Sequence, residues 1–398
     1  MARSRTILIA GAGIGGLTAA LALAQHGFRV VILEKSKRLE ETGAGIQPSP
    51  NASRIFIKLG LGEALKQTAV APDAIRIMRS SGKLIVEAPL GPAAEFRFGA
   101  PYWVIHRVDL QRALLEAASA RPEIELRLGM EFTDYAAHAR GVTVKSQGAT
   151  GDVDEHGIAL IGADGLWSNA RKALGEESAP RFAGRTAWRA MIPIERAPNA
   201  FREPVVHLWL GRAAHLVHYP VRCGRALNIV AIVGDDFQDS GWSTPGDRRA
   251  LLERFGKWCE PARTLLGVPE AWLKWALFDR APSRRWGIGP VTLLGDAAHP
   301  MLPFLAQGGA MAIEDAAALA SCLARDGESP ASALRTYEGL RSARTARVQR
   351  EARRNDIVYH LSGPAALARD MMLRTMGGEK LLLRYRWLYD WRLPPGET

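Results

Sequence analysis

The chain begins with an apolar run, Thr6-Ile-Leu-Ile-Ala10, which is followed directly by Gly11-Ala-Gly-Ile-Gly-Gly16. The run is typical of a buried parallel strand, because it is short, apolar and ended by glycine. Residues Leu17–His26 carry small and apolar side chains at helical spacing and stop at a glycine, a common helix end. A β-branched run, Arg29–Leu33, then ends on Glu34. Together these segments predict a right-handed βαβ unit.

The glycines stand where a dinucleotide-binding turn requires them, between the strand and the helix. Gly11 would make the tight turn, Gly13 would let the backbone approach a pyrophosphate, and Gly16 would let the helix pack on the strand. The helix N-terminus would stabilise the phosphate charge. Glu34 lies 21 residues after Gly13, at the place of an acid that binds a ribose 2′-OH. This motif alone does not separate FAD from NAD.

A second motif, Ile161-Gly-Ala-Asp-Gly165, follows the apolar run Ile158–Ile161 and is followed by Ser168 and Arg171. An isolated Asp-Gly pair is usually a turn. Here it stands at a predicted strand end and before a polar stretch that could start a helix.

A third motif, Leu294-Gly-Asp-Ala-Ala-His-Pro300, follows the strand-like run Val291–Leu294. The carboxylate of Asp296 is a good acceptor for the hydroxyls of a cofactor's ribityl chain. The next residues, Ala306-Gln-Gly-Gly309, lead into a strong helix over Ala310–Ala324. Amides at that helix start could stabilise negative charge on a bound ring.

The composition is that of an ordinary globular protein, with 398 residues, 47% hydrophobic and 23% charged. The three cysteines, Cys223, Cys259 and Cys322, include no close pair, which argues against a disulfide framework or a zinc site and fits a reducing compartment. We therefore expect no metal. No stretch of 18 apolar residues predicts a membrane span, and the short apolar run after Arg5 is too short for a signal peptide. A cytoplasmic location is expected.

Charge favours small anionic ligands over nucleic acid. The chain has 52 basic and 41 acidic residues, a net charge of +11, which creates a field that attracts anions. The densest basic stretch has arginines at helical spacing and no aromatic residue among them to stack a base. A solvated helix face is the favoured interpretation of these arginines, which are Arg341, Arg344, Arg347, Arg350 and Arg354.

Two strand-like runs, Val205–Leu210 and His215–Val221, flank Gly211-Arg-Ala-Ala214 and predict a hairpin. In that hairpin Leu210 lies opposite His215, and His207 lies opposite His218. Because residues two apart share a face, one face carries His215, Val217 and Tyr219 with Leu210, Leu208 and Val206, and the other carries His207, Trp209 and His218. On the first face His215 and Tyr219 are the two polar groups, and a histidine in such an apolar setting is a candidate base. A core histidine bonded to a backbone carbonyl is the alternative.

The elements predict an α/β chain, α+β overall, with two interleaved domains. A nucleotide-binding domain comprises residues 1–71, 102–176 and 277–360, and a mainly antiparallel substrate domain comprises residues 72–101 and 177–276. Residues 361–398 form a C-terminal helical segment. Other expected elements are strands at Ala74–Met78, Lys83–Val86, Trp103–His106 and Leu227–Val233 and a helix at Val108–Ala120. The basic, aromatic tail Met371–Arg392 is expected to pack on a domain or a subunit rather than on a membrane.

In this order and context the three motifs resemble those of the flavoprotein aromatic hydroxylases, the para-hydroxybenzoate hydroxylase superfamily. Nearly the whole chain takes part in the resemblance. Further matching stretches are Gly43-Ala-Gly-Ile46 with Pro50-Asn51-Ala52, Arg107-x-Asp-Leu110 with Leu114, and Tyr337-Glu338 with Arg341 and Arg344. His215-Leu-Val-His-Tyr-Pro220 and Trp387-Leu-Tyr-Asp-Trp391 make the chain most similar to salicylate hydroxylases and 3-hydroxybenzoate 6-hydroxylases within that superfamily.

The resemblance implies a Rossmann-like FAD-binding domain and an FAD-dependent monooxygenase. In such enzymes NADH or NADPH reduces the flavin, O₂ forms a C4a-hydroperoxide, and a phenolic aromatic acid, salicylate- or hydroxybenzoate-like, is hydroxylated. His215 and Tyr219 are implied to lie in the substrate pocket, and Asp164 to serve both FAD and NAD(P)H. The implied cofactor-binding residues are Gly11, Gly13, Ile14, Gly15, Gly16, Glu34, Lys35, Gly45, Arg107, Gln111, Asp164, Asp296, Pro300, Gly308 and Gly309.

One departure concerns the substrate. In 3-hydroxybenzoate 6-hydroxylases a glutamine that helps to hold the substrate hydroxyl occupies the position of Pro303, so this chain is closer there to the salicylate-hydroxylase-like members. The alternatives are a flavin monooxygenase of a larger quinone or polyketide ring, and a non-catalytic FAD- or NAD-binding protein. The expected partners are a small aromatic acid and O₂, with no nucleic acid or membrane, and a homodimer is compatible with the sequence.

Overall fold

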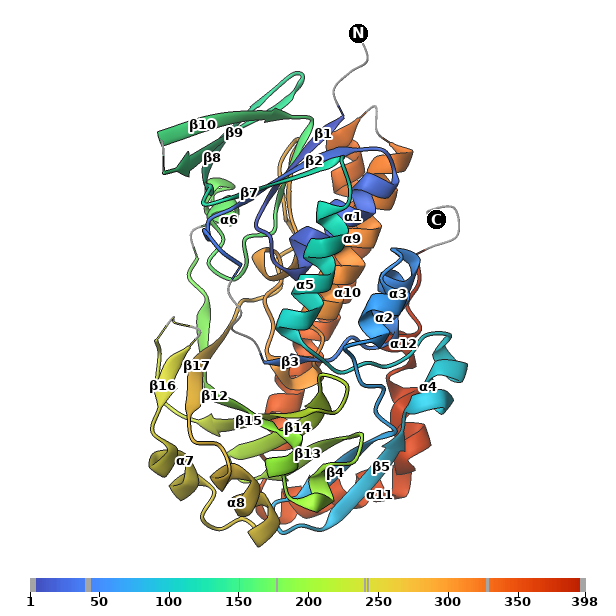
Figure 1. Ribbon diagram of the computed structural model, residues 1–398, viewed down its shortest axis with the longest axis vertical. Helices are drawn as coiled ribbons and strands as arrows, with labels where there is room; N and C mark the ends of the chain where they lie inside the picture. Colours follow the sequence, from blue (N-terminus) through green and yellow to red (C-terminus); the bar gives the residue numbers. More distant parts are fainter. Residues whose placement is uncertain are drawn as a thin grey trace.

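The computed structural model describes residues 5–39, 44–149, 151–176, 178–239, 241, 243–326 and 329–393. Figure 1 shows an elongated molecule with one sheet at each end and a long helix, α10 (Pro330–Tyr359), that runs from one towards the other. Gly43, the first residue of the matching stretch Gly43-Ala-Gly-Ile46, lies outside the described residues.

The sheet at the N-terminal end is parallel and carries the first glycine motif. Its strand order is β18 (Val291–Leu293), β11 (Ala159–Gly162), β1 (Thr6–Ala10), β2 (Arg29–Glu34) and β7 (Ile124–Leu128). Every residue of β1 is buried, as a central strand covered on both faces requires. With α1 (Ile14–Gln25) between β1 and β2, the predicted βαβ unit is confirmed.

Helices and a small second sheet cover the two faces of this parallel sheet (Figure 1). On the helical side α1 packs against both α5 (Arg107–Ser119) and α9 (Gly308–Arg325), and α9 packs in turn against α10. The other side is covered by an antiparallel meander of β8 (Glu131–His138), β9 (Gly141–Gly148) and β10 (Gly151–Gly157). The shorter helices of this half are α2 (Pro50–Lys58), α3 (Gly62–Lys66) and α6 (Asn169–Ala173).

The second large sheet has eight strands and is antiparallel except where β13 pairs with β4. Its order is β16 (Thr244–Gly246), β17 (Trp272–Asp279), β12 (Arg181–Pro193), β15 (Ala226–Gly234), β14 (Ala214–Val221), β13 (Val205–Gly211), β4 (Ala74–Arg79) and β5 (Leu84–Pro89). The helices α7 (Arg248–Arg254) and α8 (Glu260–Gly267) pack beneath it around Trp209, Phe255 and Trp272.

The hairpin register predicted from the sequence is confirmed, since Leu210 pairs with His215 and His207 pairs with His218. The strands run further than expected, and the turn itself is only Arg212 and Ala213. The run predicted as a strand over Trp103–His106 shortens to β6 (Ile105–His106), which pairs with β3 (Gly45–Ile46) to form a small bridge between the two halves.

The C-terminal segment is helical and packs on both halves. The helix α11 (Gly363–Arg384) kinks at Gly377 and lies along β5, while α4 (Gly91–Phe98) and α12 (Arg386–Tyr389) meet through their aromatic rings. The indole of Trp387 lies 3.7 Å, ring centroid to guanidinium carbon, from Arg347. The tail is therefore a domain-packing segment. No helix among the described residues is long and apolar enough to cross a bilayer.

The interpretation of the arginine row on α10 as a solvated face is wrong for two of its members. Arg341 is fully buried and pairs with Glu314 and Asp315, and Arg344 pairs with Glu314 and is covered by the C-terminal backbone. Buried charge is tolerated because each guanidinium meets a carboxylate from α9. The spacing alone could not show these partners, which lie about thirty residues earlier.

Candidate active site

The three motifs and Glu34 meet at one edge of the parallel sheet. Their strands β2, β1, β11 and β18 are neighbours in this order, and each motif begins where its strand ends. Ligands of open α/β sheets bind in the crevice at the carboxyl ends of the strands. The sequence motifs are therefore brought together at the position where such a fold binds a nucleotide.

The glycine turn has the shape that a phosphate-binding loop needs. Gly11 has φ of +105°, and a Cβ there would lie 2.5 Å from the carbonyl oxygen of Ala163. A Cβ on Gly16 would collide with the carbonyl of Gly11, whereas a Cβ on Gly13 would meet nothing within 4 Å. No side chain caps the N-terminus of α1, so its first amides are available to a phosphate group.

Glu34 is fixed beside this turn by two backbone amides. Its Oε2 accepts a hydrogen bond from the amide of Ala12 at 2.8 Å, and its Oε1 accepts one from Ser36 at 2.9 Å. The side-chain amide of Gln111 donates to the carbonyl of Ala12 at 3.3 Å. The next residue, Lys35, is exposed. The carboxylate that was expected to bind a ribose is therefore held at the glycine turn.

Asp164 of the second motif also serves as a helix cap. Ser168 Oγ donates to its Oδ1 at 2.5 Å, and the amide of Ala170 donates to its Oδ2 at 3.0 Å. Burial raises the pKa of Asp164, and these hydrogen bonds oppose the shift. The buried guanidinium of Arg171 donates to the carbonyls of Ala297 and Ala298, so the second motif is tied directly to the third.

The side chain of Asp296 is exposed, although the turn that carries it, Gly295–Ala297, starts and ends with buried residues. The nearby Arg107, at the start of α5, is exposed as well. A Cβ atom on Gly308 would lie 3.9 Å from Asp296 Oδ1. The start of α9 is therefore beside this carboxylate. A carboxylate that accepts hydrogen bonds and the N-terminus of a helix are thus close together.

The β3 bridge separates the start of α9 from the large sheet. A Cβ on Gly309 would lie 2.7 Å from Ile46 Cδ1, and one on Gly45 would lie 2.5 Å from the ring of Tyr219. The amide of Gly45 donates to Asn228 Oδ1 at 2.8 Å. Gly45 and Gly309, which were expected to bind FAD, are therefore close to Tyr219, which was expected in the substrate pocket.

A buried charge cluster supports the third motif and was not predicted from the sequence. His299 Nε2 lies 2.5 Å from Asp315 Oδ2, and Arg341 Nε donates to Asp315 Oδ1 at 2.7 Å. Asn51 donates to Glu314 Oε1 at 2.6 Å. Burial raises the pKa of Asp315, but His299 and Arg341 outweigh it and leave the pKa below its ordinary value. His299 is thus held by a buried carboxylate and belongs to the support of the third motif.

A cavity of about 210 Å³ lies on the predicted pocket face of the β13–β14 hairpin. His215 lines it together with Phe304 and Pro303 of the segment that follows the third motif. The ring of His215 contacts those of Phe304, Tyr359 and His360 at centroid distances of 5.4, 5.5 and 5.0 Å. Other cavity walls are Gln47, Tyr102, Val206, Leu208, Leu210, Val217 and residues of α10 and α11.

Tyr219 does not line this cavity, but it contacts a residue that does. It is buried beside Gly45, and burial raises its pKa well above the ordinary value despite a hydrogen bond with Gln47. Gln47 also accepts a hydrogen bond from the hydroxyl of Tyr102 at 2.6 Å. Pro300 does not line the cavity either; its carbonyl accepts a hydrogen bond from Gln349 at 2.8 Å. Tyr219 therefore stays a neutral phenol behind the cavity wall.

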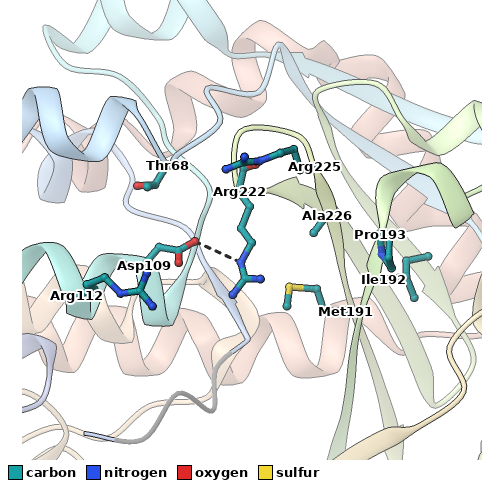
Figure 2. Close-up of a pocket in the computed structure, with 9 residues that line it drawn as sticks. All are labelled: Thr68, Asp109, Arg112, Met191, Ile192, Pro193, Arg222, Arg225 and Ala226. Carbon is teal, nitrogen blue, oxygen red and sulfur yellow. Dashed lines mark hydrogen bonds and ion pairs between the residues drawn. The ribbon is translucent and has the colours of Figure 1, made fainter.

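A second hollow, of about 640 Å³, is open and cationic (Figure 2). We call it the arginine groove; its lining residues are Thr68, Asp109, Arg112, Met191, Ile192, Pro193, Arg222, Arg225 and Ala226. Figure 2 shows the guanidinium of Arg222 between α5 and the sheet, paired with Asp109 at 3.5 Å. Three arginines against one carboxylate suit an anionic ligand.

Residues 4–352 match the family model described as the FAD binding domain, and the chain belongs to this family of flavoproteins. Within it, 3-hydroxybenzoate 6-hydroxylase 1 of Aquipseudomonas alcaligenes is 40% identical over 386 residues, covering 96% of this chain and 97% of the relative. The 3-amino-4-hydroxybenzoate 2-monooxygenase PtnB3 of Streptomyces platensis is 37% identical and covers 98% of this chain and 96% of its own length.

Solved structures agree with this assignment. A substrate complex of salicylate hydroxylase superposes with a TM-score of 0.84 at 26% identity, covering 100% of this chain and 98% of that one. Klebsiella pneumoniae HpxO complexed with FAD and uric acid gives 0.82 at 28% identity, with 95% of each chain covered. The resemblance to the para-hydroxybenzoate hydroxylase superfamily is confirmed: the chain is an FAD-dependent aromatic monooxygenase that uses NAD(P)H.

Proposed function

We propose that the chain hydroxylates a phenolic aromatic acid of the hydroxybenzoate or salicylate type, with O₂ as co-substrate. The observation that carries this proposal is the cavity beside His215. Its walls are mostly apolar, and they include His215, whose ring packs against Phe304. The cavity also borders the segment that joins the third motif to α9. Its volume of about 210 Å³ favours a single ring over a polycyclic substrate.

The residues present fit FAD. The open side of Gly13, the uncapped start of α1 and the exposed carboxylate of Asp296 suit a pyrophosphate and a ribityl chain. FAD, when bound, supplies the electron transfer and oxygen activation that no side chain can provide. The residues proposed to hold it are Gly11, Gly13, Ile14, Gly15, Gly16, Glu34, Lys35, Gly45, Arg107, Gln111, Asp164, Asp296, Pro300, Gly308 and Gly309.

His215 is the proposed base of the reaction. A phenol becomes a strong nucleophile only when it loses its proton, and its ordinary pKa is near 10, as in tyrosine. Every hydrogen bond that the described residues make to His215 involves Nδ1, which leaves Nε2 for a ligand. Tyr219, kept neutral by burial, would donate a hydrogen bond rather than accept a proton, so its proposed role is positioning.

The arginine groove is proposed to receive the phosphates of NAD(P)H. Its wall residue Met191 lies opposite Asn228 in the β12–β15 pair, and Asn228 holds the amide of Gly45. The turn that presents Arg222 is strained, because Arg222 and Cys223 both have positive φ, of 54° and 55°. Such strain persists where the surrounding structure maintains it, often at functional sites.

The names of the relatives indicate the chemical class of the substrate, and Pro303 bears on which member of that class it is. The curated relatives act on 3-hydroxybenzoate and on 3-amino-4-hydroxybenzoate, according to their names, whereas Pro303 removes the glutamine expected of 3-hydroxybenzoate 6-hydroxylases. A screen of NADH and NADPH oxidation over hydroxybenzoates and hydroxypyridine carboxylates, with analysis of products, tests the proposal. Coupled product from one such acid supports it; oxidation that no aromatic acid stimulates would count against it.

Three further parts of the proposal concern the molecule as a whole. Residues 1–71, 102–176 and 277–360 would fold as the FAD-binding unit, 72–101 and 177–276 as the substrate unit, and 361–398 as the C-terminal segment that packs on both. We propose a cytoplasmic location, which the free cysteines and the use of NAD(P)H support. A homodimer is the proposed assembly, which light scattering would test.

A further inference from the structure

His215 is the inner end of a row of polar groups that leads from the cavity towards the surface. Its Nδ1 lies 2.9 Å from Nε2 of His360, at the C-terminal end of α10. His360 Nδ1 lies 2.6 Å from the carbonyl oxygen of Asp356 and 3.0 Å from its Oδ1. Asp356 Oδ1 in turn accepts a hydrogen bond from Arg185 Nε at 2.9 Å. Only 2% of His215 is exposed, against 20% of the Asp356 side chain.

The partners in this row determine which ring nitrogens carry hydrogen. Both oxygens that face His360 Nδ1 are acceptors, so this nitrogen is the donor. In the neutral ring the lone pair of His360 is then on Nε2, and His215 must donate its Nδ1 hydrogen to it. His215 Nε2 is consequently unprotonated. This is the tautomer that a base needs, and the hydrogen bond on the other nitrogen sets it.

The surroundings of the row keep His215 neutral and Asp356 charged. The titratable and charged groups that face His215 are His360 and Tyr359 from α10 and Arg185 from β12. Burial lowers the pKa of His215, and His360 and Arg185 add to the effect. Burial raises the pKa of Asp356, but His360 and Arg185 outweigh it, so the carboxylate stays charged. The imidazole of His215, which must become cationic when it accepts a proton, is thus connected through His360 to the carboxylate of Asp356.

We propose that His360 and Asp356 are positioning residues that fix the tautomer of His215 and take up its charge when it deprotonates the substrate. The inference rests on the proposed role of His215 as base. In the step, the phenol O–H bond breaks and an Nε2–H bond forms on His215. The Nδ1 proton of His215 passes to His360 Nε2, and the Nδ1 proton of His360 passes to the Asp356 carboxylate and then to water. Only protons move.

The tautomer is measured without any substrate. In protein labelled with ¹⁵N-histidine, the nitrogen shifts of His215 should show hydrogen on Nδ1 and none on Nε2. His360→Phe removes the acceptor and should populate the other tautomer, whereas His360→Gln, whose side-chain oxygen can accept the same hydrogen bond, should retain the wild-type form. Hydrogen on Nε2 in the wild type, or no difference between the two variants, would overturn the assignment.

The charge is measured on His215 itself, in the holoenzyme labelled with ¹⁵N-histidine, by following its ring nitrogen shifts across pH. Asp356→Asn should lower the pKa of His215 by about one unit, the size of effect expected when one nearby opposite charge is lost. Asp279→Asn is the matched control, because it breaks another ion pair to α10, with Arg353 at 2.6 Å, outside the row. It should leave the pKa of His215 unchanged. Whether His215 accepts the phenol proton is measured separately, by following the phenolate absorbance of bound 3-hydroxybenzoate across pH without NAD(P)H.

Failure of this inference differs from failure of the proposed function. If His215→Phe leaves the phenol titration as in the wild type, His215 is not the base and the proposed function loses its mechanism. If His215→Phe raises the phenol pKa while Asp356→Asn behaves as Asp279→Asn does, His215 remains the base and the row through His360 is only structural.

Discussion

At the scale of single residues, the chemistry depends on one imidazole in an apolar cavity. His215 combines burial, aromatic neighbours and a ring nitrogen that no described residue hydrogen-bonds. Its neighbours on the hairpin differ in role. His207 and His218 stack on the opposite face at 4.5 Å between ring centroids, where they contact Phe201 and have no access to the cavity. Side-chain direction, more than residue type, therefore assigns function along this hairpin.

His215→Phe should keep its FAD and lose most of its hydroxylase activity. General base catalysis typically contributes about 10²-fold or more, so kcat for product formation should fall by about that factor while flavin absorbance persists. Product formation under saturating substrate provides the measurement. Unchanged turnover in a flavin-loaded variant would remove His215 from the mechanism.

At the scale of elements, α9 and α10 are joined by charges that pack in the interior. Arg341 is fully buried and pairs with two carboxylates of α9. Arg341→Met should lower the free energy of unfolding by about 3–5 kcal/mol, because it leaves buried carboxylates without their partner. Urea unfolding measures this loss. The matched control is Arg386→Met, whose pair with Asp390 is exposed and should cost less than about 1 kcal/mol; equal losses would contradict the account.

The arginine groove is also formed by several elements, since its lining residues come from α5, β12 and the turn after β14. Arg222→Gln and Arg225→Gln should each raise KM for NAD(P)H by about tenfold, the effect of about 1.4 kcal/mol from a lost charged contact. FAD content should stay constant. Arg212→Gln, on the turn between β13 and β14, is the control. A KM that responds equally to all three variants would assign the effect to general charge rather than to the groove.

At the scale of the whole molecule, buried histidines make stability depend on pH. Burial, with a smaller effect of Arg76, lowers the pKa of His207 to about 4, and burial, with a smaller effect of His207, lowers the pKa of His218 well below its ordinary value. The unfolded chain binds these protons at about pH 6.5, whereas the folded chain does not. Stability is therefore complete above pH 6.5 and falls as the pH drops towards 4, by up to about 1.4 kcal/mol per unit for each histidine.

Urea unfolding at pH 7 and pH 5 checks this dependence. His207→Leu should lose less stability between the two pH values than the wild type, because one titrating group is removed. His138→Leu, in which an exposed histidine is replaced, should behave as the wild type does. A wild type that is equally stable at both pH values would contradict the argument.

The features that could be predicted from the sequence are those that short-range backbone geometry determines. The turn at Gly11–Gly16 and the pairing of Leu210 with His215 were predictable, because glycine spacing and strand alternation leave few other structures. The β8–β10 meander was missed, since β8 and β10 are largely exposed and carry few apolar residues. The burial of Arg341 and the contact of His215 with His360, 145 residues apart, depend on packing between distant segments, which no local pattern records. The role of each site residue stays a prediction.

The central claim is that this chain uses FAD and NAD(P)H to place one oxygen atom of O₂ on a phenolic aromatic acid. It is tested most directly by supplying ¹⁸O₂ to the FAD-loaded enzyme with NAD(P)H and the best hydroxybenzoate from the screen. The account predicts one labelled hydroxyl per product and one NAD(P)H oxidised for each. A protein that takes up no flavin, or one that oxidises NAD(P)H with the label absent from every aromatic product, would contradict it.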